Sequence, residues 1–121
     1  MIKLVALFKR KAGMSMEEFS QYYENNHVPL VKKYMPQIVH YRRNYVIPAS
    51  TLEAGHMDSA APPMPDFDVI TEAWFENREQ YDAMILVTSD PKIGAIIAED
   101  EAKFFDRTSM TMFLVDERIT E

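Results

Sequence analysis

Two successive strand–helix–strand patterns within 121 residues predict an α+β protein with the ferredoxin-like fold, a four-stranded antiparallel sheet with its helices on one face. Three observations support this class. Four short segments are rich in branched and aromatic residues, helical periodicity follows the first and the third of them, and the chain is long enough for one hydrophobic core but not for two. We therefore expect residues 1–121 to form a single domain.

The first strand and the first helix have clear signals. Residues 2–9, IKLVALFK, form a short apolar run with branched side chains, as in a strand covered on both faces. Ser15 is a good N-cap, and Glu18 three residues later completes a capping box. Apolar residues then recur at helical spacing over 16–35, and His27 lies on this apolar stripe.

A proline interrupts this helix two residues after the histidine. Pro29 has no backbone donor, and a proline in a helix interior costs about 3 kcal/mol. The carbonyl of Asn25 should therefore lack its helical partner. We expect a local bend that changes the direction of His27.

Three further segments alternate in polarity as strands do. They are 38–48, 67–75 and 109–117. In the segment 67–75, Glu72 and Trp74 fall on the side opposite a mainly apolar set. This alternation predicts one face packed against helices and one face of mixed character.

The connections between these strands also carry signals. Residues 49–65 are rich in proline and show no periodicity, so we expect a loop that is mobile or packs over the mouth of a cavity. Asn77 is a good N-cap for a second helical region. Asp90 followed by Pro91 marks a further helix start, either of a separate helix or of the second part of a broken one.

The composition excludes several classes of site and partner. The net charge is −6, which argues against a nucleic-acid partner, and no apolar run approaches the roughly 20 residues that span a membrane. The absence of cysteine excludes disulfides and thiolate sites, and the three histidines, His27, His40 and His56, are too scattered to predict a metal site. Three glycines and no phosphate-binding loop argue against a nucleotide cofactor. Basic residues follow the N-terminal apolar run, the reverse of a secretory signal, so we expect a cytoplasmic protein.

The sheet face without helices predicts a homodimer. Ile70 and Trp74 belong to this face, together with alternate apolar residues of the first and last strands. An isolated domain would expose a large apolar patch there. A second copy of the chain would cover it, giving a two-fold dimer whose two sheets enclose a shared barrel. The bend at Pro29 would turn His27 towards the end of this barrel.

Three stretches carry a family resemblance: KRKAGMSMEEFSQYYENNHVPLV, FDVITEAWF and EDEAKFFDRTSMTMFLVDE. With them, the chain resembles the EthD-like family of the dimeric α+β barrel superfamily. The most specific signal is the pattern aromatic-Tyr-x-x-x-His-x-Pro-Leu over residues 22–30. The resemblance implies the dimeric barrel fold. It also points to a family that includes proteins tied to ether degradation and to aromatic polyketide tailoring.

His27 is the first candidate for chemistry, because imidazole gains and loses a proton near neutral pH. The alternative is a structural histidine bound to a carbonyl that Pro29 leaves free. Asp100, on the apolar stripe of the last helix, and Asp106, at the start of the last strand, are the carboxylates that could orient the imidazole. The resemblance favours Asp106 as the second catalytic residue, and a carboxylate in turn hydrogen bonds is the alternative.

A second set of residues could line the shared barrel and bind a flat phenolic ligand. These are Tyr23, His40, Arg42, Glu72 and Trp74, with Asn44 beside them. The alternative is structural: Arg42 pairs with Glu72 across neighbouring strands, Trp74 belongs to the dimer interface, and the tyrosines pack.

Two functions follow from these candidates. The first is a cofactor-free enzyme, a lyase, cyclase or monooxygenase, that acts on a small aromatic or polyketide-like compound in the barrel cavity. The second is a non-catalytic, ligand-binding or stress-associated barrel protein. An enzyme cavity should hold a polar group within reach of His27, whereas a carrier cavity should be almost wholly apolar there.

Overall fold

A computed structural model of the chain describes residues 1–47 and 64–121, so most of the expected loop 49–65 lies outside the described residues. The elements in chain order are β1 (Ile2–Arg10), α1 (Met16–Tyr22), the π-helical segment η1 (Tyr23–His27), α2 (Val28–Tyr34), β2 (Ile38–Tyr45), β3 (Val69–Phe75), α3 (Arg78–Ser89), α4 (Pro91–Glu101) and β4 (Phe105–Val115).

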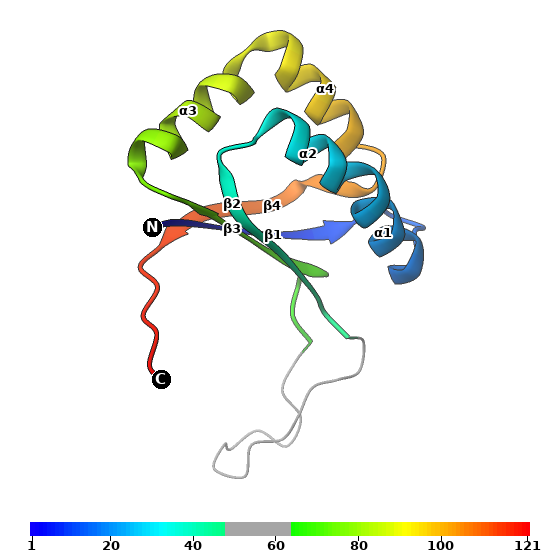
Figure 1. Cartoon of the computed structure of the whole chain (residues 1–121). Helices are drawn as coiled ribbons and strands as arrows, with labels where there is room; N and C mark the ends of the chain where they lie inside the picture. Colours follow the sequence, from blue (N-terminus) through cyan, green and yellow to red (C-terminus); the bar gives the residue numbers. More distant parts are fainter. Residues whose placement is uncertain (48–63) are drawn as a thin grey trace.

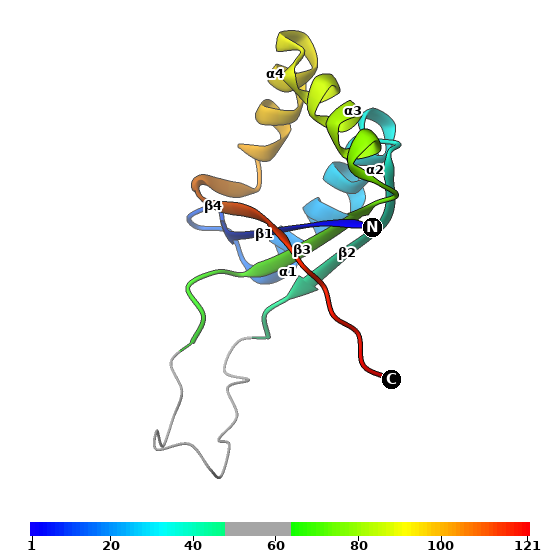
Figure 2. The ribbon, with the colours of Figure 1, turned by 90° about the vertical axis from the view of Figure 1, so that its left-hand side faces the viewer.

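The four strands form one antiparallel sheet in the order β2-β3-β1-β4 (Figure 1). All the helices lie on one face of this sheet, and the other face carries none, as the turned view shows (Figure 2). The predicted fold class is therefore confirmed. Among the described residues, no helix combines the length and the apolar composition needed to cross a bilayer.

The predicted capping box begins the first helix. The backbone N–H of Glu18 donates to the Ser15 hydroxyl at 3.1 Å, and the backbone N–H of Ser15 donates to the Glu18 carboxylate at 3.0 Å. Two of the four unpaired N–H groups of the helix start are thereby satisfied.

The interruption near Pro29 is a widened helical turn. The N–H of Val28 reaches back five residues to the carbonyl of Tyr23, which defines the π segment η1. Pro29 then falls in the first turn of α2, where a missing N–H costs little. The chain continues as helix to Tyr34, and the wide turn leaves His27 buried.

The strand register separates two sets of side chains. Ala6 is paired with Thr71, and Leu4 with Ala73, on the face that the helices cover. Residues between these positions point to the open face. The alternation predicted for 67–75 is confirmed, since every second residue of β3 from Val69 onward packs in the core.

The observed strand ends differ from the predicted ones at one place in particular. β4 begins at Phe105, four residues before the predicted start at Ser109, because Phe105 pairs with Arg10 of β1. The register between β1 and β4 then shifts near Asp106, whose carboxylate binds the backbone N–H of Thr108 at 3.0 Å. This local turn breaks the polarity pattern on which the prediction depended.

An aromatic cluster joins the helices to the sheet. Phe104, at the end of the α4 connection, is fully buried and lies 5.7 Å from Phe19, 5.1 Å from Tyr23 and 5.0 Å from His27 between ring centroids. Phe8 of β1 contacts the same cluster from the sheet. The ring of Phe104 therefore supports the segment that carries His27.

We predict that Phe104→Ala lowers the free energy of unfolding by about 3–5 kcal/mol, because it opens a cavity within this aromatic cluster. Leu86→Ala, on an exposed position of α3, is the control and should change stability by under about 1 kcal/mol. Urea denaturation of both variants measures the difference. Equal losses in the two variants would contradict the central role of Phe104.

Candidate functional site

A cavity of about 220 Å³ lies between the helices and the helix-covered face of the sheet. Most of its wall is apolar, with residues from all four strands and from η1, α2, α3 and α4. The polar residues in the wall are Tyr23, His27, Tyr41, Thr71, Thr88 and Glu101. A small apolar cavity with few polar groups is the usual form of a small-molecule site.

His27 reaches the cavity from the end of η1. The residue is 5% exposed, and its Nδ1 lies 2.9 Å from the Oδ2 of Asp100 on α4. A carboxylate oxygen accepts, so the imidazole nitrogen Nδ1 carries the proton and donates a hydrogen bond to Asp100. The neutral imidazole then has its lone pair on Nε2, the nitrogen that can accept a proton from a ligand.

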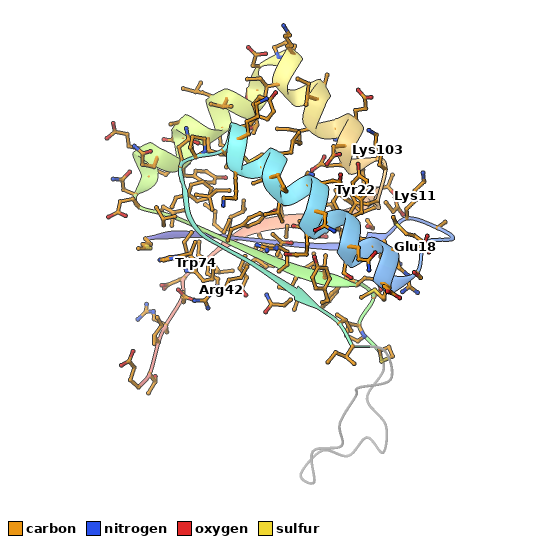
Figure 3. All side chains as sticks on the ribbon, turned by 45° about the vertical axis from the view of Figure 1, so that its right-hand side comes forward. Lys11, Glu18, Tyr22, Arg42, Trp74 and Lys103 are labelled. Carbon is orange, nitrogen blue, oxygen red and sulfur yellow. The ribbon has the colours of Figure 1, made fainter. Side chains whose placement is uncertain are left out.

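Tyr22 holds the other oxygen of Asp100. Its hydroxyl donates to Oδ1 at 2.7 Å, and its ring stacks on Phe104 at 5.3 Å. Burial, and then the bond to Asp100, raise the pKa of Tyr22 to about 12, so the phenol remains a donor at neutral pH. Figure 3 shows Tyr22 on the helix-covered side of the sheet. Tyr22, Asp100 and His27 thus form one hydrogen-bonded row that fixes the imidazole.

The carboxylate of Glu101 belongs to the cavity wall. Its Oε1 accepts from the Nε of Arg107 at 3.2 Å, and its side chain is 14% exposed. Burial raises the pKa of Glu101, although the cation of Arg107 and the neighbouring His27 act in the opposite direction. The cavity therefore has an acidic group besides the histidine.

Three hydroxyls make a separate row deeper in the cavity wall. The Tyr23 hydroxyl lies 2.6 Å from the Thr71 hydroxyl and 3.0 Å from that of Tyr41. Burial raises the pKa of Tyr23 to about 12 and raises that of Tyr41 as well. These phenols are neutral at physiological pH, so they can donate hydrogen bonds but do not act as bases.

The structure pairs His27 with Asp100 and not with Asp106. Asp106 is exposed, and its carboxylate accepts from the backbone N–H and the hydroxyl of Thr108 at 3.0 and 2.6 Å. These bonds lower the pKa of Asp106. The preference for Asp106 is therefore not supported by any contact with the histidine, and its catalytic role remains a prediction. Asp100 was the other candidate, because it shares the apolar stripe of α4.

The sheet separates the other predicted ligand-binding residues from His27. His40, Arg42 and Glu72 lie on the open face with Trp74, because β2 and β3 pair these positions directly. Figure 3 shows Arg42 and Trp74 side by side, away from the helices, and the guanidinium lies 5.0 Å from the indole ring. Only Tyr23 of this set shares the cavity with His27.

The open face holds an ordered charged network. Lys3 bridges Glu72 at 2.6 Å and Glu117 at 2.8 Å, and the indole N–H of Trp74 donates to Glu117 at 2.9 Å. The Lys3 bonds lower the pKa of Glu72 and of Glu117. Glu72 thus forms its ion pair with Lys3 and not, as the structural alternative expected, with Arg42. Arg42 packs over the ring of Trp74.

Sequence reasoning missed Tyr22 and Glu101 as site residues. Tyr22 is the aromatic position of the Tyr-x-x-x-His pattern, so a signal for it was present. Glu101 falls four residues after the buried Ile97, so it shares the apolar stripe of the helix with Asp100, whereas the exposed Glu99, two residues after Ile97, falls outside it. Its position in the cavity wall depends on how α4 packs on the sheet.

We predict that Asp100→Asn moves the imidazole proton of His27 from Nδ1 to Nε2 in a part of the molecules, because an amide can present a donor where the carboxylate only accepts. The free energy of unfolding should fall by about 1–3 kcal/mol. Glu99→Gln, one residue away on the exposed side of α4, is the matched control. Nitrogen-15 NMR of the imidazole reads the tautomer, and an unchanged spectrum in Asp100→Asn would contradict this arrangement.

Comparisons with known proteins agree with this architecture. The EthD domain family matches residues 11–108. No protein with a curated description is similar enough in sequence to count as a relative.

Three solved structures show the fold. An ethyl tert-butyl ether D (EthD) family protein from Bacillus halodurans has 19% identity and a TM-score of 0.62, over 98% of this chain and 99% of that one. An EthD-like protein from Ralstonia eutropha has 21% identity and a TM-score of 0.62, over 95% and 89%. A dimeric ferredoxin-like protein of unknown function from Thermobifida fusca has 15% identity and a TM-score of 0.52, over 94% and 88%. Since the EthD domain family matches residues 11–108, which are most of the chain, the chain belongs to this family.

Proposed function

We propose that the protein is a cofactor-free enzyme that acts on a small aromatic or polyketide-like compound, as a lyase, cyclase or monooxygenase. The observation that carries this proposal is the hydrogen-bonded His27–Asp100 pair, whose buried imidazole lines a largely apolar cavity. The compound would bind in this cavity, between the sheet and the helices. His27 would be its general acid or base.

The geometry supports proton transfer by His27. Asp100 accepts the hydrogen bond from Nδ1–H, so Nε2 can take a proton from a bound ligand, and the nearby carboxylate stabilises the imidazolium that forms. Asp100 is the orienting residue, because Asp106 has no bond to the histidine among the described residues.

The cavity wall supports a flat apolar ligand. Phe8 and Phe105 lie 4.1 Å apart between ring centroids, and both line the cavity with Phe75. Rings and methionines offer broad apolar contact, while the few polar groups can orient a ligand oxygen.

A non-catalytic binding protein is the second candidate. The observation that favours it is the largely apolar wall, in which the Tyr23 and Thr71 hydroxyls are already paired with each other. The presence of Glu101 in the same cavity as His27 supports the enzyme instead, since a carrier of apolar compounds has no need of two ionisable groups there.

We also propose a homodimer formed through the open face of the sheet. Phe113 and Val115 of β4 are 40% and 36% exposed, and the register puts them beside Val5 and Lys3 on that face. A second copy would cover these side chains and enclose the network around Trp74 within a barrel. His40, Arg42, Glu72 and Trp74 would then line the space between the two sheets, where a ligand-binding role for them remains a proposal.

His27→Gln tests the catalytic proposal. A thermal-shift screen of quinones, anthrones and phenolic acids identifies ligands, and turnover assays on the hits identify a substrate. We expect His27→Gln to retain the fold and to lose about 10²- to 10⁴-fold in turnover, because an amide cannot exchange protons near neutral pH. A stable variant with full activity on a confirmed substrate would leave the binding protein as the better proposal.

Phe113→Glu tests the dimer. We expect the unchanged chain to sediment as a dimer at micromolar concentration. The variant should sediment as a folded monomer, because a charge in an apolar interface is costly to bury. Leu86→Glu, on the exposed surface of α3, is the control and should remain dimeric. A stable monomer of the unchanged chain would disprove the proposed dimer.

A further inference from the structure

Glu101 is a partly paired carboxylate in the wall of the cavity that holds His27. Arg107 binds one of its oxygens, Oε1, at 3.2 Å. Within residues 1–47 and 64–121, no hydrogen bond to the other oxygen, Oε2, is observed. A carboxylate with a free oxygen at a cavity surface can exchange a proton with a bound molecule.

Two kinds of neighbour act on the charge of Glu101: apolar side chains disfavour it, and the cation of Arg107 favours it. Apolar side chains of the cavity wall, such as Ile97 and Phe105, disfavour the carboxylate. The titratable and charged groups that act on it are His27 from η1, Arg107 from β4 and Asp100 from its own helix. Burial is the strongest of these influences, so the pKa of Glu101 is raised above its usual value.

We infer that Glu101 is a second proton-transfer residue of the cavity and that the ligand is an aromatic compound with a ketone group. His27 takes the proton from the carbon next to the carbonyl, and Glu101, in its acid form, gives its proton to the carbonyl oxygen. This inference rests on the proposed function, in which His27 is the base.

The step conserves atoms and electrons. The C–H bond breaks and its electron pair forms the carbon–carbon double bond of the enol, while the former C=O pair takes the Glu101 proton as a new O–H bond. The products are the enol, an imidazolium at His27 and a carboxylate at Glu101. Reversal of the step with solvent protons restores both groups. No oxidant or other co-reactant is needed.

Two features of the cavity agree with a ketone ligand. Glu101 and His27 line the cavity from different elements, α4 and η1. One group can therefore act on the C–H bond of the ligand and the other on its carbonyl oxygen. Asp100 already binds the Nδ1 of His27, which leaves Asp100 to support the base and Glu101 to supply the acid. The consecutive residues Asp100 and Glu101 thus have different roles: Asp100 orients the base, and Glu101 is the acid.

Hydrogen–deuterium exchange of 2-tetralone tests this inference. Proton NMR in D₂O follows the loss of the hydrogens next to the carbonyl, and tetralin, which lacks the carbonyl, should compete for binding without exchanging. We expect the unchanged protein to accelerate exchange and Glu101→Gln to slow it by about 10²-fold, at unchanged affinity for tetralin. Gln preserves the shape of the side chain, and Glu99→Gln is the matched control that should exchange at the full rate.

The pH profile separates an acid role from a structural one. Exchange that needs the acid form of Glu101 is lost as the pH rises through the pKa of Glu101. The cation of Arg107 lowers this pKa, so Arg107→Gln should raise it and move the loss of activity to higher pH. A variant that is merely damaged would lose activity at every pH without this shift.

The outcomes distinguish the inference from the function on which it rests. Loss of exchange in His27→Gln together with full exchange in Glu101→Gln overturns the inference and leaves His27 as the base. Failure of the unchanged protein to bind or to exchange 2-tetralone also overturns it, while the ligand screen and turnover of His27→Gln decide the proposed function separately.

Discussion

The hydrogen bond between His27 and Asp100 is the contact on which the candidate site depends. It joins η1, in the first half of the chain, to α4, in the second half, across 73 positions of sequence. Each group satisfies a polar atom of the other, and an unpaired polar group beside apolar side chains would be costly. Tyr22 donates to the other carboxylate oxygen of Asp100, and Phe104 packs against the rings of Tyr22 and His27. The pair therefore links helix packing to the chemistry of the cavity.

The two faces of the sheet differ in composition and in the proposed role of each. The helix-covered face forms one wall of the cavity with His27, whereas the open face carries a network of charged side chains around Trp74. The charges on the open face are largely paired with one another: Lys3 serves two carboxylates, and Arg42 packs on the indole. Such a face combines apolar area with satisfied charges, which suits contact with a second chain better than exposure to solvent. A ligand between two such sheets would be distinct from one beside His27, because the sheet itself lies between the two places.

The widened turn of η1 explains how a proline is tolerated beside the candidate catalytic residue. A π turn shifts the helical register by one residue, so the side chains after it point in a new direction. His27 ends this turn and is buried, and Pro29 falls where the following helix has no donor to lose. The sequence signal of an interruption was correct, but its form, a wide turn and not a simple bend, depends on where the flanking helices pack. π turns are frequent at functional sites, in agreement with the proposed role of His27.

The sequence by itself determined the fold class, the capping box at Ser15, the helix starts at Asn77 and Asp90 and the alternation of β3, because these features depend on neighbours within a few residues. It also identified His27 and left Asp100 as one of two possible partners. Only the tertiary structure chose Asp100, brought Tyr22 and Glu101 to the site and assigned Trp74 to the opposite face from His27. The physical reason is that periodicity tells which residues share a face of one element, whereas the distance between residues of different elements is set by how helices and sheet pack together.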